Sequence, residues 1–296
     1  MSAPIMDYRS PKICQTAEEF LSVLSPRNTA LWGEPGKWVF RGQSDDDWHL
    51  IPSALRVKGQ DHLVGLRGFG FNDAPKPRNQ DFGNHEYHQQ IRLMKAILSR
   101  FHTRFTRSGL HLEKDCINTY LEAERGEPTP DVLPFLALAQ HHGVPTLLLD
   151  WSRRSYVAAY FSAMVGQGAR DDQRIAVWCL NQSVLPKGVG YIQFHEPSAW
   201  QNPNLAAQDG LFTWTDQEGE FINANIEDMV SGPIAGRCAI ERDCAIGEDD
   251  VLRKIVLSTQ QAGRLLQLLS YEGFDGSTLY PGVDGMVRAL KEREHW

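Results

Sequence analysis

The sequence lacks the cysteine spacing and the long apolar runs that mark several classes of protein. Its 296 residues include five cysteines but no CxxC pair, and the spacing of the one close pair, Cys238 and Cys244, fits no common zinc motif. No apolar run approaches the roughly 20 residues that cross a bilayer, and the first residues contain no apolar signal core. These absences predict reduced thiols, no membrane contact and a cytoplasmic location.

The chain also lacks a surplus of positive charge. It has 30 Lys and Arg against 37 Asp and Glu, a formal net charge of -7. Broad electrostatic binding to nucleic acid needs many cations facing phosphates, so this balance argues against it and leaves room only for a local basic groove. With 42% hydrophobic and 23% charged residues, the composition is that of an ordinary globular protein.

Familiar catalytic and nucleotide-binding motifs are missing as well. The sequence contains no GxGxxG, no Walker loop, no HExxH and no GxSxG. A metal site is not predicted, because no third ligand follows the adjacent His141 and His142 at a convincing spacing.

Two polar clusters stand out instead. Residues 140–152, QHHGVPTLLLDWS, place polar side chains at both ends of a short apolar run, and Trp38–Gln43 ends an apolar strand in Arg-Gly-Gln. A buried strand needs no polar groups crowded at its ends, whereas a strand end is a rigid platform for a site. We therefore expect the two clusters to meet at a cleft.

Each polar residue also has a structural interpretation. Arg41 either pairs with a carboxylate or offers its planar donor fork to a phosphate or ribose, with Gly42 letting a ligand approach the backbone. Neighbouring helical residues point in different directions, so only one of His141 and His142 easily faces a site. Asp150 either bonds to backbone N–H groups or belongs to the cleft.

Two further polar residues, Ser152 and Gln208, also have more than one interpretation. Ser152 is a helix cap, a substrate contact or, least favoured, a nucleophile, since no nucleophile-elbow pattern surrounds it. Gln208 precedes an apolar strand at Leu211-Phe212; an amide is no general base, although it orients ribose hydroxyls well. A loop glutamine is the simpler interpretation of Gln208.

Periodicity predicts mixed helices and strands in one α+β domain spanning residues 1–296. A long loop over residues 57–82, a possible lid, and an irregular acidic insertion over 217–250 interrupt it. Thr16 and Glu19 form a capping box for the first helix, and the basic side of the 85–106 helix is interpreted as a solvated face. The predicted helices are 14–25, 85–106, 131–142, 155–164, 260–269 and 286–294, and the main predicted strands are 38–40, 147–149, 175–180 and 254–257.

These motifs resemble the FRG domain family, named for its aromatic-Arg-Gly motif. The resemblance rests on Phe40–Gln43, Leu50–Arg56, Leu138–Ser152, Ala158–Phe161, Ala207–Phe212 and Ser277–Gly285. It departs at Leu147, where a basic residue is more usual, and at Tyr280, where Phe is usual.

The order of parts is also similar, more weakly, to the ADP-ribosyltransferase superfamily. That resemblance implies a split mixed sheet with flanking helices around a cleft that holds NAD as the substrate. It implies a catalytic set and an NAD-binding set. The catalytic set is Arg41, His141, Asp150 and Gln208; the NAD-binding set is Arg41, Gly42, Gln43, Thr146, Trp151, Ser152 and Tyr160, with Trp151 or Tyr160 stacking on nicotinamide.

The implied function is a mono-ADP-ribosyltransferase toxin of bacterial toxin–antitoxin or anti-phage systems. Its acceptor would be a nucleic acid, RNA ahead of protein, and its partner an antitoxin or chaperone docked on residues 217–250. The chain departs from the superfamily where Gln208 replaces the usual catalytic Glu. That departure keeps two alternatives open: a non-catalytic nucleotide sensor, and a nuclease centred on His141, His142 and Asp150.

Overall fold

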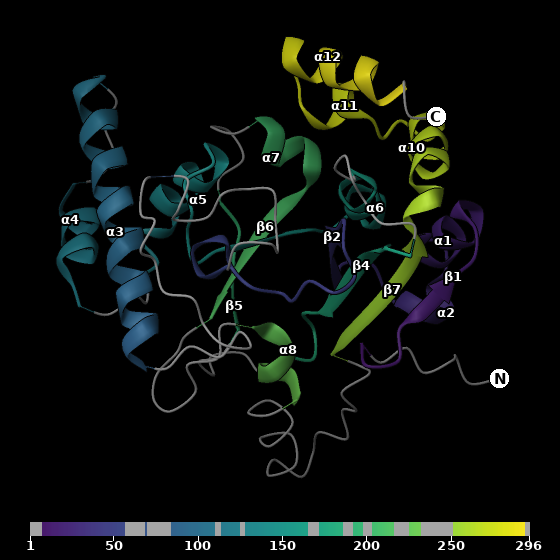
Figure 1. Cartoon of the computed structure of the whole chain (residues 1–296), viewed down its shortest axis with the longest axis horizontal. Helices are drawn as coiled ribbons and strands as arrows, with labels where there is room; N and C mark the ends of the chain where they lie inside the picture. Colours follow the sequence, from purple (N-terminus) through teal and green to yellow (C-terminus); the bar gives the residue numbers. More distant parts are fainter. Residues whose placement is uncertain are drawn as a thin grey trace.

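The computed structural model describes residues 8–56, 69, 84–109, 114–124, 128–164, 172–185, 192–197, 203–215, 225–231 and 251–293. Helices and strands interleave along the chain (Figure 1). The strands are β1 (Lys12–Cys14), β2 (Trp38–Gln43), β3 (Leu149–Ser152), β4 (Arg174–Asn181), β5 (Ile192–His195), β6 (Gly210–Thr215) and β7 (Leu252–Ser258). The α-helices are α1 (Ala17–Leu24), α2 (Thr29–Trp32), α3 (Asn84–Arg107), α4 (Lys114–Glu122), α5 (Leu133–His141), α6 (Ser155–Ala163), α7 (Pro203–Gln208), α8 (Ile226–Met229), α10 (Ala262–Tyr271), α11 (Gly276–Leu279) and α12 (Val283–Glu292).

The strands form one mixed sheet in the order β1-β7-β4-β2-β3-β6-β5. Only the pair of β1 and β7 is parallel among these neighbours; the others are antiparallel. The sheet lies in the centre of the molecule, with helices around it (Figure 1). Strands and helices mixed without a repeated βαβ unit agree with the predicted α+β class.

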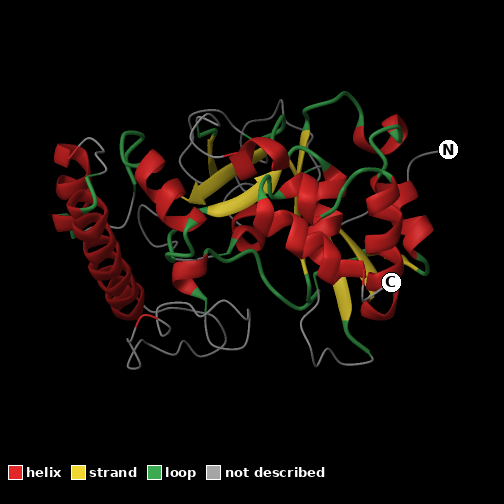
Figure 2. Ribbon diagram, turned by 90° about the horizontal axis from the view of Figure 1, so that it is seen from above, coloured by secondary structure: helices red, strands yellow, loops and turns green. Residues whose placement is uncertain are grey.

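Strand β4 shows why the centre of the sheet is buried on both faces. Its residues alternate between two apolar clusters: Val177 packs with α1, α6 and α10, whereas Trp178 packs on the other face with α8. Successive strand side chains point to opposite faces, so a strand covered on both sides is apolar throughout. A third cluster joins α3, α4 and α5 to one end of the sheet, and Figure 2 shows α3 standing at that end.

Most helices begin and end close to the predicted positions. Thr16 Oγ1 accepts from the Glu19 backbone N–H at 3.1 Å, while the Glu19 carboxylate accepts from the Gln15 backbone rather than from Thr16. Helix α5 ends just before Gly143, whose φ of 77° is the left-handed conformation that glycine adopts freely.

Two local predictions were wrong. The strand expected at residues 147–149 is β3, which begins at Leu149 and runs through Ser152, so Asp150 lies inside the strand. Lys95 is buried rather than solvated, because its ammonium donates to the carbonyl oxygens of Tyr120 and Ala123 at 2.6 and 2.8 Å and so caps the end of α4. Apart from Phe69, the predicted loop 57–82 lies outside the described residues, as does most of 217–250.

Within the described residues, no helix combines the length and apolarity needed to cross a membrane. Among the described residues, Cys14, Cys116 and Cys179 form no disulfide, and burial raises the pKa of Cys14 to about 12. Cys238 and Cys244 lie outside the described residues.

Candidate active site at the split of the sheet

The sheet is split between its central strand, β2, and the neighbouring strand, β3. β2 and β3 share one registered pair, Phe40 with Ser152, whereas β2 and β4 share six. Continued antiparallel pairing would bring Gly42 opposite Asp150, and the strands diverge instead. A cavity of about 510 Å³ lies at this split, lined by β2, β3, α6, α7 and the segments around Trp48 and Tyr280. Its size falls in the range of small-molecule sites.

Arg41 bridges the two diverging strands. Its Nη1 donates to the Asp150 carbonyl oxygen at 2.9 Å and lies 3.4 Å from the Asp150 carboxylate. The side chain is only 13% exposed, and its Nε is buried without a hydrogen-bond partner among the described residues. A buried donor without a hydrogen-bond partner costs free energy, so this guanidinium is suited to bind an anionic ligand.

Gly42 is needed for packing beneath the cavity. A Cβ at this position would lie 1.9 Å from the Ala158 carbonyl oxygen and 2.6 Å from the Ser162 backbone nitrogen of α6. The missing side chain therefore lets α6 approach β2 closely. Gly42 also lines the cavity, but the helix, rather than the ligand suggested by the sequence, accounts for the glycine.

Asp150 is held by a chain of hydrogen bonds. Gln140 Nε2 donates to its Oδ1 at 2.7 Å, and Thr146 Oγ1 donates to Gln140 Oε1. The Leu148 backbone N–H donates in turn to Thr146 Oγ1 at 3.1 Å. Thr146 is fully buried and does not line the cavity, so among these residues it positions the amide that orients the carboxylate.

The rings of the two adjacent histidines pack edge to face with centroids 5.1 Å apart, and only one of them lines the cavity. His141 lines the cavity, while the ring of His142 packs 6.4 Å from that of Phe101 on α3. Burial, aided by the neighbouring His142, lowers the pKa of His141 below its ordinary value. Of the pair, His141 is therefore the one placed to contact a ligand.

Ser152 fastens β3 to the end of α7, which leads into β6, and the Gln208 side chain fastens the same point to α11. The Ser152 hydroxyl donates to the Gln208 carbonyl oxygen at 2.7 Å and accepts from the Arg154 backbone N–H at 2.9 Å. The Gln208 side-chain amide donates to the Leu279 carbonyl oxygen at 3.1 Å. Both residues line the cavity, but the serine hydroxyl is already occupied in holding the strands together.

The turn between Gln208 and β6 carries a strained residue. Asp209 has a φ of 47°, a left-handed conformation uncommon for a residue with a side chain. Its carbonyl oxygen accepts from the Arg153 backbone N–H at 3.0 Å, and its carboxylate lies 3.5 Å from the Arg153 guanidinium. These contacts fix the direction in which the chain enters β6 beside the cavity.

The aromatic residues at the cavity differ from the predicted ones. Tyr160 is fully buried, does not line the cavity and donates to Glu292, and burial strongly raises its pKa. Trp151 lines the cavity, yet its indole Nε1 donates to buried Thr213 at 2.8 Å. Phe161 and Tyr280 line it as well, with ring centroids 6.3 Å apart. The accessible aromatic surface of the cavity thus comes from Phe161, Tyr280 and the half-buried Trp48 rather than from Tyr160.

Gln43 lines one side of the cavity. Both polar atoms of its amide are already hydrogen-bonded to the protein. Its Oε1 accepts from Trp178 Nε1 at 2.7 Å, and its Nε2 donates to the His49 carbonyl oxygen at 3.2 Å. This second bond holds the segment that contains His49 against the end of β2. His49 itself lines the cavity, and the side chain is 43% exposed.

A buried carboxylate supports His49. Glu227 of α8 has a side chain only 6% exposed, and its Oε1 lies 3.2 Å from His49 Nδ1. The same carboxylate accepts from the Leu50 backbone N–H at 3.0 Å. The hydrogen bond with Glu227 raises the pKa of His49 above its ordinary value, against the opposing effect of burial.

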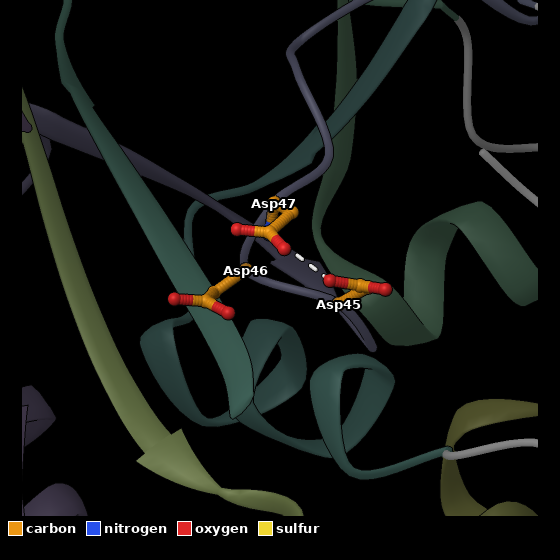
Figure 3. A group of neighbouring side chains, drawn as sticks. All are labelled: Asp45, Asp46 and Asp47. Atoms are coloured by element: carbon orange, nitrogen blue, oxygen red, sulfur yellow. Dashed lines mark hydrogen bonds between the residues drawn. The ribbon is translucent and has the colours of Figure 1, made fainter. Parts of the chain in front are cut away.

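Three consecutive aspartates follow β2 in a tight turn. One carboxylate oxygen from each of Asp45, Asp46 and Asp47 lies within 4.8 Å of those of the other two (Figure 3). Asp46 is buried and its carboxylate pairs with Arg174 at 2.8 Å, while the Asp47 backbone N–H donates to Asp45 Oδ1. None of the three lines the cavity at the split, so we assign them to the turn and to the Arg174 ion pair.

The structure thus brings Arg41, His141, Asp150 and Gln208 to one cavity, with Gly42, Gln43, Trp151 and Ser152, and leaves Thr146 and Tyr160 outside its lining. Sequence reasoning missed Gln140, which stands beside His141 in the same motif, and Tyr280, which lies in the last FRG-like motif. It also missed His49 and Glu227, which are 178 positions apart and carry no local signal.

Comparison with known families agrees with the resemblance to the FRG domain over part of the chain. The family model of the FRG domain matches residues 36–171, the part of the chain that runs from the start of β2 past the end of α6. That match contains Arg41, Gln140 and Asp150, and it ends before β6, α8 and Tyr280. No curated protein and no solved structure matches the chain.

Proposed function

We propose that the cavity at the split of the sheet binds NAD and transfers its ADP-ribose to a macromolecule. The observation that carries this proposal is the adjacency of three strands. β2 with Arg41, β3 with Asp150 and Ser152, and β6 preceded by Gln208 are neighbours in the sheet and border one cavity. These are the three parts, in this order along the chain, that the weaker superfamily resemblance assigns to NAD.

Arg41 is the residue assigned to the NAD pyrophosphate. Its guanidinium is largely shielded from solvent, and its Nε donor has no partner in the described structure. A planar guanidinium binds phosphate oxygens through parallel hydrogen bonds, which are stronger in a shielded site. Arg56 also lines the cavity and adds positive charge for the same group.

Asp150 is assigned to the reacting ribose. When the glycosidic bond breaks, its electron pair moves to the pyridinium nitrogen, neutral nicotinamide leaves, and positive charge develops on the ribose. A fixed carboxylate close to that charge lowers the barrier, since it needs no reorganisation during the reaction. Gln140 and Arg41 fix Asp150 in this way. In this scheme Asp150 takes the part of the glutamate that Gln208 replaces.

Phe161 and Tyr280 are assigned to the nicotinamide ring in place of Tyr160. Their rings line the cavity in an edge-to-face arrangement, and the Arg288 guanidinium lies 4.0 Å from the Tyr280 ring centroid. A rigid aromatic surface binds a flat ring at little entropic cost. His141 lies at the same cavity, and its lowered pKa favours a neutral imidazole that can hydrogen-bond to the substrate.

RNA is the acceptor to test first, as the toxin-like resemblance suggests. His142 stands next to His141 and packs against Phe101 of α3, where Arg104 is exposed one turn further along. Arg107 is also exposed on that helix. Local positive charge near the cavity suits a short nucleic-acid segment despite the net charge of -7.

The decisive experiment follows nicotinamide release and ADP-ribose transfer from labelled NAD, with total RNA, DNA or cell protein as the acceptor. We expect wild type to release nicotinamide and label RNA, and Arg41→Ala to lose both. Arg27→Ala is the matched control, because Arg27 is exposed and does not line this cavity. Labelled protein without labelled RNA would move the acceptor to protein, and no release under any condition would refute the transferase.

A nucleotide sensor is the second candidate, and one observation favours it. Among the residues the structure describes, Asp150 is the only carboxylate that lines the cavity. A sensor would bind NAD at the same arginine and leave its glycosidic bond intact. Calorimetric binding that depends on Arg41, with no nicotinamide released, would establish this alternative.

A further inference from the structure

His49 and Glu227 form a hydrogen-bonded pair at the edge of the cavity. Glu227 is buried and holds His49 Nδ1 at 3.2 Å, and the Leu50 backbone N–H donates to the same carboxylate at 3.0 Å. The Ile226 backbone N–H also donates to the Leu50 carbonyl oxygen at 3.3 Å. Both backbone polar groups of Leu50, the residue after His49, are therefore bonded to α8. The imidazole is therefore fixed in orientation.

The other ring nitrogen of His49 is free to meet a ligand. With Nδ1 donating to Glu227, neutral imidazole carries its lone pair on Nε2, and Nε2 has no partner in the described part of the chain. The side chain is 43% exposed and lines the same cavity as Arg41 and Asp150. A buried carboxylate that orients an imidazole at the edge of a cleft is an arrangement suited to a general base.

We infer that His49, oriented by Glu227, takes the proton from the acceptor group that attacks the ribose of NAD. This inference rests on the proposed function. The bond from the ribose C1′ to nicotinamide breaks with its electron pair on nicotinamide, and a bond from C1′ to the acceptor oxygen or nitrogen forms. The acceptor proton moves to His49 Nε2, and the imidazolium is stabilised by Glu227.

The proton balance also restricts the acceptor. A carboxylate or a phosphate has already lost its proton at neutral pH and needs no base. A hydroxyl or an amino group retains its proton and requires one. The pair therefore predicts transfer to a hydroxyl or amino group.

Charges from several elements surround the pair. Glu227 and Asp228 of α8 favour the imidazolium, whereas burial and Lys254 of β7 oppose it, and the balance raises the pKa of His49. Because only neutral imidazole accepts a proton, the reaction rate should rise with pH through this raised pKa. Removing the Glu227 charge should lower the pKa and move the rise to lower pH.

The test measures kcat across pH for transfer to total RNA and for hydrolysis of NAD by water, with NAD affinity measured in parallel. We expect His49→Gln to lose about a hundredfold or more in kcat, together with the acid limb of the profile, at unchanged NAD affinity. Glu227→Gln should lose less and shift that limb to lower pH. His88→Gln is the matched control, because His88 is exposed on α3 and does not line the cavity.

Two outcomes overturn the inference and leave the proposed function intact. His49→Gln could keep the wild-type kcat and acid limb, or the modified acceptor group could prove to be a carboxylate or a phosphate. His49→Ala with added imidazole provides an independent check: recovery of at least about tenfold supports a proton-transfer role, and no recovery contradicts it. Wild type that releases no nicotinamide refutes the proposed function itself, and it does so without reference to any variant.

Discussion

The two edges of strand β2 differ in how they are closed. Along one edge it pairs with β4 through six residues, from Trp38 opposite Asn181 to Gln43 opposite Ala176. Along the other edge it pairs with β3 through Phe40 alone, and the Arg41 side chain then takes over as donor to the Asp150 carbonyl oxygen. The closed edge builds the core of the sheet, and the open edge borders the cavity.

The difference shows how one short strand serves both stability and a candidate site. At the closed edge, backbone groups bond to one another and apolar side chains are buried on both faces. At the open edge, the Arg41 side chain donates to the Asp150 carbonyl oxygen, and Thr146 Oγ1 accepts from the Leu148 backbone N–H. Backbone polar groups must be satisfied in either case, and here side chains satisfy them while leaving room for a ligand.

The largest expected effect comes from Gly42→Ala, which forces the open edge away from α6. The new Cβ would lie 1.9 Å from the Ala158 carbonyl oxygen, so the helix or the strand must move. We expect the free energy of unfolding to fall by about 3 kcal/mol or more in urea denaturation, at the upper end of overpacking costs. Gly36→Ala, where no atom lies within 4 Å of the new Cβ and φ is 82°, should cost only about 1–2 kcal/mol. Equal losses would disprove the packing role of Gly42.

The next effect compares Arg41, at the open edge of β2, with Arg253, on β7 and away from the cavity. Arg41→Ala should weaken NAD binding by roughly 2 kcal/mol, about thirtyfold, because a charge-assisted contact is lost. Arg253 on β7 donates to the Leu31 carbonyl oxygen at 2.7 Å and lies 4.4 Å from the Trp38 ring centroid. Arg253→Ala should reduce stability and leave NAD affinity unchanged. Calorimetry and denaturation of both variants test this, and the same loss of affinity in both would remove the distinction.

Local sequence patterns predicted the elements better than their pairing. The 85–106 helix follows from the helical spacing of Ile91, Met94 and Leu98, all buried in α3. The strand at 147–149 was misplaced because Leu147 and Leu148 are buried against α3 and α5 rather than paired in the sheet. An apolar run records burial, and it does not record which backbone bonds its residues make.

The site was predictable only in part, for a similar reason. Arg41 and Asp150 stood out as polar residues beside short apolar runs, and neighbouring strands bring them together. Tyr160 and Phe161 are adjacent on α6, and no local pattern indicates which of the two side chains faces the cavity. Glu227 could not be found at all, since its role depends on α8 folding back onto His49 from 178 positions away.

A smaller effect is expected from Thr146→Val, which keeps the shape of the side chain and removes the hydroxyl behind the open edge. The Leu148 backbone N–H would lose its acceptor and Gln140 its donor. We expect a loss of about 1 kcal/mol in stability, as for an unsatisfied buried donor. Transfer activity should fall as well, because Asp150 is less firmly held. Normal kcat in this variant would show that Gln140 does not need Thr146.

The smallest expected effect concerns two histidines of the cavity whose pKa values move in opposite directions. Glu227 raises the pKa of His49, so its contribution to stability is complete below about pH 6.5 and is lost as the pH rises through the folded-state pKa. Burial lowers the pKa of His141, so the folded state favours its neutral form and loses stability as the pH falls below about 6.5. Both side chains are partly exposed, and solvent screening keeps each effect small.

Denaturation of wild type, His49→Gln and His141→Gln at about pH 5.5 and about pH 8.5 separates these contributions. The stability advantage of wild type over His49→Gln should shrink as the pH rises, and its stability relative to His141→Gln should grow. NMR titration of the two imidazoles gives the same directions without unfolding the protein. Slopes of the same sign would mean that Glu227 does not bond to His49 in solution. The proton acceptor of the open edge would then have to be sought at His141, whose lowered pKa keeps it neutral at physiological pH.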